Sequence, residues 1–264
     1  MLYPRLIPSL LINSKKELVK TKVFKNQHYI GDPLNAAYIF SGFDADELFV
    51  LDIDASKNKK CISLDFVKSL STFTKVPLTV GGGITNLNQI NTILSLGVEK
   101  IALSNILSED FNLLQKASNS YGASSITVVI NSLRKDNGKI VGYFGRPRSS
   151  KISFPINDLT KKCQDNGAGE LVINRVDIEG TKKGFDVDLM SSLNEKLSIP
   201  LVALGGCGKL KHIEDLISKT RISGIACGSF FVYAEDSQEV LLSYETASKW
   251  LKNYFSKKNN IIPK

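Results

Sequence analysis

Two stretches of the chain, VPLTVGGGI at residues 76–84 and IPLVALGGCG at residues 199–208, share one form. Each is a short apolar run that ends in a cluster of glycines. Their matching prolines, Pro77 and Pro200, lie 123 residues apart. An apolar run followed directly by glycines is typical of a buried strand whose end leads into a tight loop.

A second pair of stretches repeats with nearly the same offset. DELFVLDIDAS at residues 46–56 resembles AGELVINRVDIEGT at residues 168–181, and Glu47 and Glu170 are again 123 residues apart. Since the offset recurs at separate places, the sequence predicts an internal duplication into two similar halves. We expect these halves at about residues 1–123 and 124–255.

Eight short apolar runs alternate with longer amphipathic segments. Near-continuous apolar strands between helices predict a parallel sheet that helices cover, and eight such units favour a closed barrel over an open sheet. We therefore expect one α/β domain, a (β/α)₈ TIM barrel, over residues 1–255, and a polar C-terminal tail at 256–264. The runs lie at residues 6–12, 47–53, 77–80, 100–103, 126–130, 170–174, 200–204 and 224–227.

Composition restricts the class of protein and of partner. No apolar run approaches the ~20 residues that span a bilayer, and the N-terminus lacks the features of a signal peptide, so we expect a cytoplasmic protein with no membrane contact. The net charge is +8, but no basic stripe interleaved with aromatics predicts a nucleic-acid partner. A phosphorylated small molecule fits this charge equally well. The four cysteines show no metal-binding spacing, so we expect no metal, no cofactor and no disulfide framework.

Glycine and serine follow four of the predicted strands. Gly81–Gly83 follows the third strand and 205–208 follows the seventh, while Ser104-Asn105 and Gly228-Ser229 end the fourth and eighth strands. Backbone N–H groups and hydroxyls in such loops can bind phosphate. The alternative is that these glycines only form tight turns. Two symmetric loops favour a ligand with a phosphate at each end.

Carboxylates at strand ends are candidates for acid–base chemistry. Asp52, Asp54 and Asp177 occupy such positions. Alternatively they cap helices or orient loops, which is the interpretation we favour for Asp54.

The phrases GDP, ELFVLDIDAS, VGGGI, GAGE, DIEGTKKGFD and GGCGK resemble the cyclase subunit of imidazole glycerol phosphate synthase, HisF, from residue 1 to about 250. The resemblance implies a glutaminase partner at the bottom of the barrel and ammonia passing up the barrel to a substrate with two phosphates. It assigns one phosphate to Gly83, Ser104 and Asn105. It assigns the other to four residues of the second half, Gly180, Gly206, Gly228 and Ser229.

The resemblance also implies an ammonia gate, a ring of charged residues at the bottom of the barrel. The matching residues are Arg5, Glu47, Lys100 and Glu170, and all four carry the charge of the family. Two cations and two anions can compensate one another where burial makes a lone charge costly. The alternative is four unrelated surface charges. The mobile-loop lysine of the family corresponds to Lys20.

The catalytic pair of the family is absent. Its two aspartates correspond to Leu11 and Asn131. Leucine cannot transfer a proton and asparagine is not a base at neutral pH. Each acid–base group contributes typically ~10²–10⁴ in rate, so we expect little cyclase activity. Asp52 and Asp136 are conceivable substitutes, on another strand and in a loop.

Three functions are compatible with this pattern. The stretch at residues 18–40 resembles a HisF-like branch of surface-polysaccharide biosynthesis, in which a HisH-like glutaminase supplies ammonia for an acetamidino sugar. We favour this function, with a sugar amidotransferase as third partner and phosphate loops that bind a nucleotide sugar or are idle. The alternatives are a genuine cyclase of histidine biosynthesis and a non-catalytic scaffold that activates a glutaminase.

Overall fold

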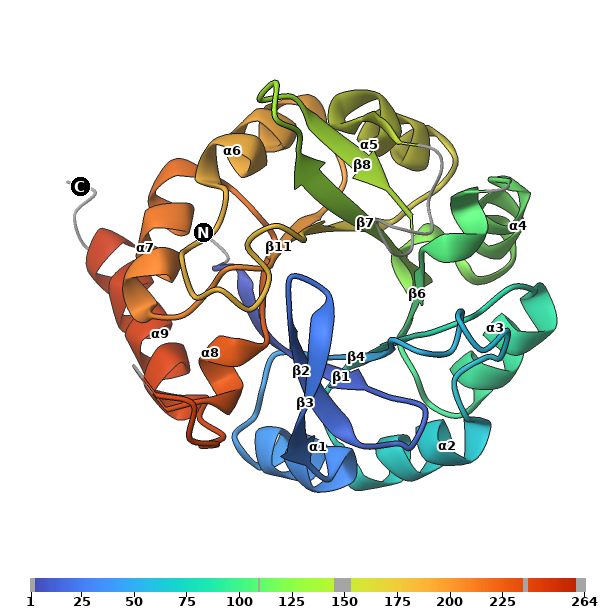
Figure 1. Cartoon of the computed structure of the whole chain (residues 1–264), viewed down its shortest axis with the longest axis horizontal. Helices are drawn as coiled ribbons and strands as arrows, with labels where there is room; N and C mark the ends of the chain where they lie inside the picture. Colours follow the sequence, from blue (N-terminus) through green and yellow to red (C-terminus); the bar gives the residue numbers. More distant parts are fainter. Residues whose placement is uncertain (1–2, 109, 145–152, 235–236, 260–264) are drawn as a thin grey trace.

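The fold is a closed barrel of eight parallel strands (Figure 1). It is known from a computed structural model that describes residues 3–108, 110–144, 153–234 and 237–259. Ladders between neighbouring strands run around the barrel, and β12 pairs with β1 to close it. The predicted TIM barrel is thereby confirmed, and each of the eight apolar runs forms a barrel strand. The strands are β1 (Arg5–Ile12), β4 (Leu48–Asp52), β5 (Leu78–Gly81), β6 (Lys100–Leu103), β7 (Ile126–Arg134), β10 (Glu170–Arg175), β11 (Leu201–Leu204) and β12 (Gly224–Cys227).

Helices form the outer layer, and side-chain caps define where several of them begin. Asp32 accepts a hydrogen bond from the Asn35 N–H at the start of α1, as Ser63 does from Phe66 at α2. Every helix in the described ranges is too short or too polar to span a bilayer. The helices are α1 (Pro33–Gly42), α2 (Leu64–Phe73), α3 (Leu87–Ser95), α4 (Asn112–Tyr121), α5 (Ile156–Asp165), α6 (Val187–Lys196), α7 (Leu210–Lys219), α8 (Ser229–Val232) and α9 (Glu245–Asn259), with 3₁₀ turns η1 (Asn105–Ser108) and η2 (Ala123–Ser125).

The end of α9 differs from the expected boundary. The helix runs to Asn259, so residues 256–259 continue it and do not begin a separate tail. Residues 260–264 of the predicted tail lie outside the described part of the chain.

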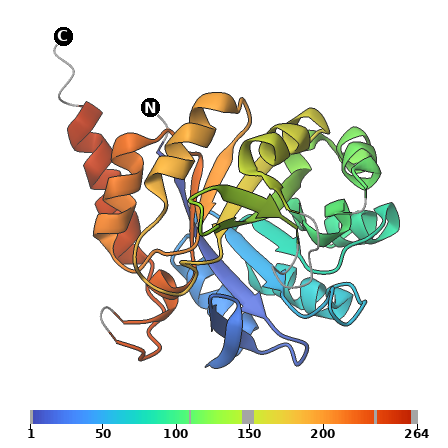
Figure 2. The same cartoon turned by 45° about the horizontal axis from the view of Figure 1, so that its top comes forward.

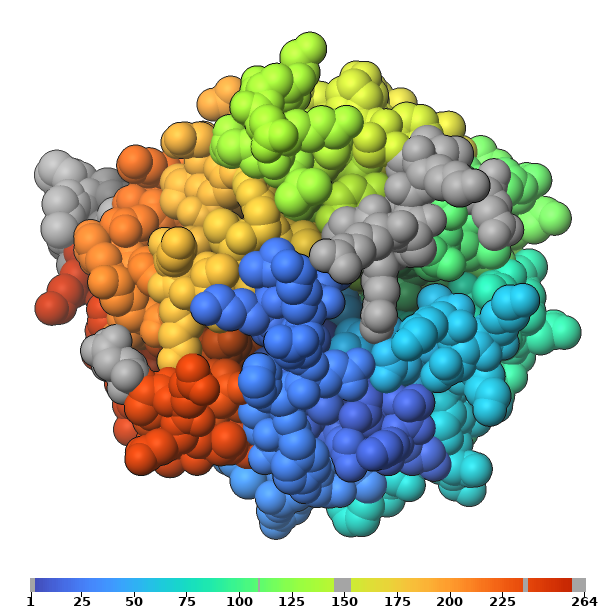
Figure 3. All heavy atoms as spheres, viewed as in Figure 1, coloured from blue at the N-terminus to red at the C-terminus, as the bar shows by residue number. Residues whose placement is uncertain are grey.

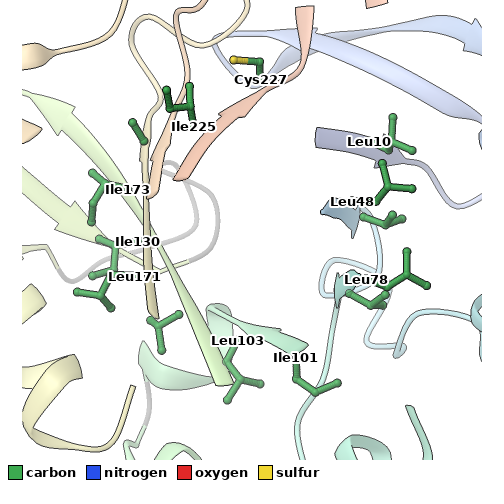
Figure 4. Close-up of a cluster of buried hydrophobic side chains, with 14 of the residues drawn as sticks. Leu10, Leu48, Leu78, Ile101, Leu103, Ile130, Leu171, Ile173, Ile225 and Cys227 are labelled. Carbon is green, nitrogen blue, oxygen red and sulfur yellow. The ribbon is translucent and has the colours of Figure 1, made fainter. Parts of the chain in front are cut away.

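Strand residues alternate between two apolar regions. One set packs outward beneath the helices, and Leu48, Leu78, Leu171 and Ile173 in Figure 4 belong to it. The other set fills the bore of the barrel, where Ile7, Phe49, Ala102, Val129, Val172, Val202, Leu204 and Ala226 form a cluster of their own. Because successive side chains of a strand point to opposite faces, the residues two positions before or after a bore residue in the same strand also face the bore.

Two antiparallel additions extend the barrel at the same end and were not predicted. β2 (Leu18–Lys22) pairs with β1 and with β3 (Lys25–Gly31), while β8 (Ile140–Tyr143) pairs with β7 and with β9 (Phe154–Pro155). The additions follow the first and the fifth barrel strands. Figure 2 places the β2–β3 hairpin away from the chain termini, at the end where the barrel strands finish.

Candidate functional site

A cavity of about 1040 Å³ opens at the carboxyl ends of the barrel strands. Both predicted phosphate groups of residues line it, Gly83, Ser104 and Asn105 from the first half and Gly180, Gly206, Gly228 and Ser229 from the second. The tertiary structure thus brings residues far apart in sequence to one mouth, which is where barrel enzymes place their sites. Asp52, Leu11, Lys20 and Asn131 line the same cavity.

Close packing explains part of the glycine pattern. A Cβ atom at Gly83 would overlap the carbonyl of Lys60, and one at Gly206 would overlap the carbonyl of Gly184. Both residues also have positive φ, 61° and 96°. Glycine is therefore needed at these positions for the loop fold itself, so its presence alone does not demonstrate a phosphate site.

Charge around the cavity gives independent support for an anionic ligand. Lys25, Lys57, Lys59 and Lys60 are exposed and line the mouth, and the backbone of Lys60 lies against Gly83 of the first glycine loop. Lysine ammonium groups attract phosphate as point charges. The hydroxyl of Ser104 donates to the carbonyl of Val129 at 2.9 Å.

Lys20 lies on strand β2 and is buried at the edge of the cavity. Its Nζ donates to the carbonyl of Ser9 at 2.6 Å and lies against Gly228. Burial lowers the pKa of Lys20 to about 8, and the nearby Glu179 carboxylate opposes this effect. The lysine that the family resemblance assigns to a mobile loop is here held by a strand, with its ammonium beside the second phosphate group of residues.

The β2–β3 hairpin crosses the mouth and is fixed on both sides. On one side, the loop after β10 supplies Glu179, which accepts from Thr21 Oγ1 at 3.1 Å and from the Phe24 N–H at 3.3 Å. On the other side, Gln27 Nε2 donates to the buried Asp54 at 3.2 Å. In Figure 3 the blue hairpin lies between the gold segment after β10 and the cyan segment after β4.

The two positions that the resemblance matches to the catalytic aspartates carry no titratable group. Leu11 lies at the end of β1 and faces the cavity. Asn131 on β7 is buried, and its Oδ1 accepts from Asn174 Nδ2 at 3.0 Å. A leucine and a carboxamide can shape the mouth or bind a ligand, but neither can shuttle a proton at neutral pH.

The remaining carboxylates have different roles. Asp52 lines the cavity and accepts from the N–H groups of Asp54 and Ala55, while burial raises its pKa above the ordinary value. Asp177 lies outside the cavity lining and forms a two-bond ion pair with Arg175, at 3.0 and 2.7 Å. Asp136 is exposed in the loop between β7 and β8. Asp52 is therefore the carboxylate of this group with access to a ligand.

At the opposite end of the barrel the four predicted gate residues meet in a ring of alternating charge. Arg5 pairs with Glu47 and with Glu170. Lys100 pairs with the same two carboxylates, at 3.0 and 3.2 Å. Both glutamates are nearly fully buried. Burial lowers the pKa of Arg5, but the two glutamates raise it by more, so this guanidinium stays charged.

An apolar layer separates the ring from the mouth. Val129, Ala102, Leu204 and Ala226 of the bore cluster line the floor of the cavity. None of the four ring residues reaches the cavity. The barrel therefore has charges at one end, an apolar bore, and a basic polar cavity at the other end.

The structure adds residues that sequence reasoning missed. Glu179, Asn174 and the lysines of residues 57–60 all line the mouth. Asn174 and Glu179 are polar residues at or just after an apolar strand, which is the signal that could have identified them. Among the described residues, no group of three or more His, Cys, Asp or Glu side chains could hold a metal ion.

Comparisons with known proteins agree with this architecture. Residues 5–237 match the family described as histidine biosynthesis protein. The "Putative imidazole glycerol phosphate synthase subunit HisF" of Leptospira borgpetersenii is 38% identical over 92% of this chain and 96% of its own length. The "Putative imidazole glycerol phosphate synthase subunit hisF3" of Vibrio vulnificus is 36% identical over 94% of this chain and 95% of its own length. The imidazole glycerol phosphate synthase subunit HisF of Clostridium botulinum is 31% identical over 92% of this chain and 96% of its own length.

Proposed function

The chain belongs to the histidine biosynthesis protein family, and from this premise we propose that it is a HisF-like synthase subunit that conducts ammonia from a HisH-like glutaminase through its barrel. In this proposal the glutaminase binds at the end of the barrel that carries the charged ring. Ammonia then leaves at the mouth, where a phosphorylated or nucleotide-sugar ligand binds. The product is an amidino sugar for surface polysaccharide, and not an imidazole ring.

The charged ring and the apolar bore support conduction. A neutral ammonia molecule can cross an apolar layer, whereas an ammonium ion would lose its hydration at high cost. The ring carries two cations and two anions, so its formal charges cancel. The two glutamates compensate the cations, so the ring remains folded in its buried position.

Leu11 and Asn131 are the residues that distinguish the proposed subunit from a cyclase. They line the mouth together with the residues assigned to the two phosphates, so the mouth keeps a place for an anion but has lost the two acids. The name of the relative hisF3 supports the proposal that a HisF-like subunit can exist in addition to the HisF of histidine biosynthesis. A sugar amidotransferase would then be the third partner, which uses the ammonia at the mouth.

The first test measures cyclase chemistry directly. Purified protein is supplied with ammonium and the ribulosyl aminoimidazole carboxamide nucleotide that HisF enzymes use. We expect a rate at least ~10²-fold below that of a HisF with both aspartates, because two acid–base groups are missing. Turnover at ordinary enzyme rates would refute the proposal and establish a genuine cyclase, the alternative that the Clostridium botulinum relative favours.

The second test separates a conduit from a scaffold that only activates a glutaminase. In the complex with the glutaminase and the sugar amidotransferase, Glu170→Gln should let glutamine-derived ammonia leak to the solvent while glutamate formation continues. Lys161→Met, at an exposed ion pair on α5, is the control and should leave the leak unchanged. If the Glu170→Gln complex loses no coupling between glutamate and product, the barrel is a scaffold.

A further inference from the structure

Strands β7 and β10 present three successive cross-strand pairs to the bore. The ladder pairs Glu170 with Thr127, Val172 with Val129, and Asn174 with Asn131. Alternate residues of a strand share a face, and the two valines belong to the bore cluster. The pairs therefore lead from the charged ring through an apolar pair to a pair of carboxamides at the floor of the mouth.

The two carboxamides are joined by one hydrogen bond, from Asn174 Nδ2 to Asn131 Oδ1 at 3.0 Å. This leaves Asn174 Oδ1, which is buried and accepts no hydrogen bond from any described residue. The side chain is only 6% exposed and lines the cavity. Buried polar atoms are nearly always paired, so an unpaired buried acceptor on a residue of the cavity wall indicates a ligand that donates to it.

We propose that Asn174 Oδ1 is the acceptor of a binding site for ammonia, at the point where the apolar bore opens into the mouth. The site rests on the proposed function, because the bore delivers a small N–H donor to this position. Ammonia fits because it carries three N–H groups and is the molecule that the proposed function delivers through the bore. Asn131 holds the Asn174 side chain in place through the hydrogen bond between them.

A carboxamide pair suits this task better than the aspartate of the family. A carboxylate would accept a proton or hold ammonium through its charge, and ammonium is not a nucleophile. Carboxamides accept and donate hydrogen bonds but do not titrate. Leu11, at the end of β1, adds an apolar surface to the same cavity and offers no competing acceptor.

The direct test is a crystal structure of the full chain soaked with methylamine. Methylamine keeps the amine donors of ammonia, and its carbon distinguishes it from water in the electron density. A buffer of about pH 9 leaves Lys20, whose pKa burial lowers to about 8 against the opposing effect of Glu179 and Cys227, mostly uncharged. At this pH the probe is mostly methylammonium, which still carries its N–H donors. We expect the methylamine nitrogen within hydrogen-bond distance of Asn174 Oδ1.

Variants assign the binding to the acceptor atom. Asn174→Leu removes the carbonyl at similar volume and should abolish the methylamine density, while Asn174→Asp keeps an acceptor and should retain it. Tyr143→Phe is the matched control. Tyr143 Oη is also buried without a partner among the described residues, but the residue does not line the cavity, so its removal should change nothing at the mouth.

Two results would overturn the site. One is density for water alone beside Asn174 at a methylamine concentration that fills other positions. The other appears in a parallel soak with N-acetylglucosamine, if a sugar hydroxyl occupies Oδ1 and methylamine does not. The wild-type soak needs no variant to fold and no partner protein. Its failure is therefore distinct from a failure of ammonia conduction, which the Glu170→Gln leak measures.

Discussion

His212 supports the second glycine loop from the side of helix α7. Its Nδ1 accepts a hydrogen bond from the Gly208 N–H at 3.1 Å, which requires that nitrogen to be unprotonated. Burial lowers the pKa of His212, and Lys209 lowers it further, while Asp215 acts in the opposite direction. The folded protein therefore disfavours the imidazolium form that would break this bond.

We expect this histidine to make the protein less stable in mild acid. Since the folded pKa lies below the ordinary value of about 6.5, the unfolded chain binds the proton more readily. The contribution is fully present above about pH 6.5 and is lost as the pH falls from there toward the folded pKa. The melting temperature of wild type should drop more between pH 7.5 and pH 5.5 than that of His212→Asn.

Two observations would contradict this role of His212. One is an equal drop in the two proteins. The other is a larger drop in His212→Asn. His28 on strand β3 is exposed, so His28→Asn is the matched control and should behave as wild type.

At the scale of elements, the β2–β3 hairpin covers the mouth with one largely buried strand, β2, and one largely exposed strand, β3. All five residues from Lys25 to Tyr29 are exposed. A two-stranded hairpin is marginally stable by itself, so its position depends on contacts with neighbouring loops. Glu179 supplies two of these contacts, to Thr21 and to Phe24.

Glu179→Ala should therefore release the hairpin. Losing hydrogen bonds worth roughly 1–2 kcal/mol corresponds to a roughly 5–30-fold rise in local opening. Limited trypsin cleavage after Lys22 or Lys25, and amide exchange across residues 18–31, should speed up by that factor. The exposed Asp136 provides the control, because Asp136→Ala removes a carboxylate at the same end without touching the hairpin. Unchanged cleavage in Glu179→Ala would show that other contacts hold the hairpin.

At the scale of the whole molecule, the charged ring joins strands from both predicted halves of the barrel. Arg5 begins β1, Glu47 directly precedes β4 and Lys100 begins β6, while Glu170 begins β10. Thr79 and Thr127 donate additional hydrogen bonds to the two glutamates. Each charge in the ring has two partners of opposite sign, so no member can be removed without unbalancing the others.

A double-mutant cycle should detect this coupling. We expect Lys100→Met and Glu170→Gln each to lower the free energy of unfolding by about 1–3 kcal/mol, and the double variant to lose less than their sum by about 0.5–3 kcal/mol. Chemical denaturation measures all three. The exposed pair Lys161–Asp165 is the control cycle, for which about 0.5 kcal/mol or less is expected. Additive effects at the ring would mean that its charges act independently.

The sequence by itself determined the barrel and the ends at which its residues lie. Apolar runs that alternate with helical segments leave few ways to bury every strand, and a parallel strand carries its loop residues to the carboxyl end of the sheet. The charges at the strand starts and the glycines after the strand ends therefore lie at opposite ends of the barrel. The duplication that the repeated offsets indicate stays a prediction.

Only the tertiary structure decided which side chains meet. Strand β3 exposes residues Lys25 to Tyr29, and side-chain contacts that hold the hairpin at the mouth come from Glu179 and Asp54 on distant loops. The position of Asn174, whose Oδ1 has no hydrogen-bond donor among the described residues, likewise depends on the pairing of β7 with β10, which joins residues 43 positions apart. Local sequence encodes the strand and its buried face, whereas hydrogen bonds across the mouth depend on barrel closure, which the whole chain produces together.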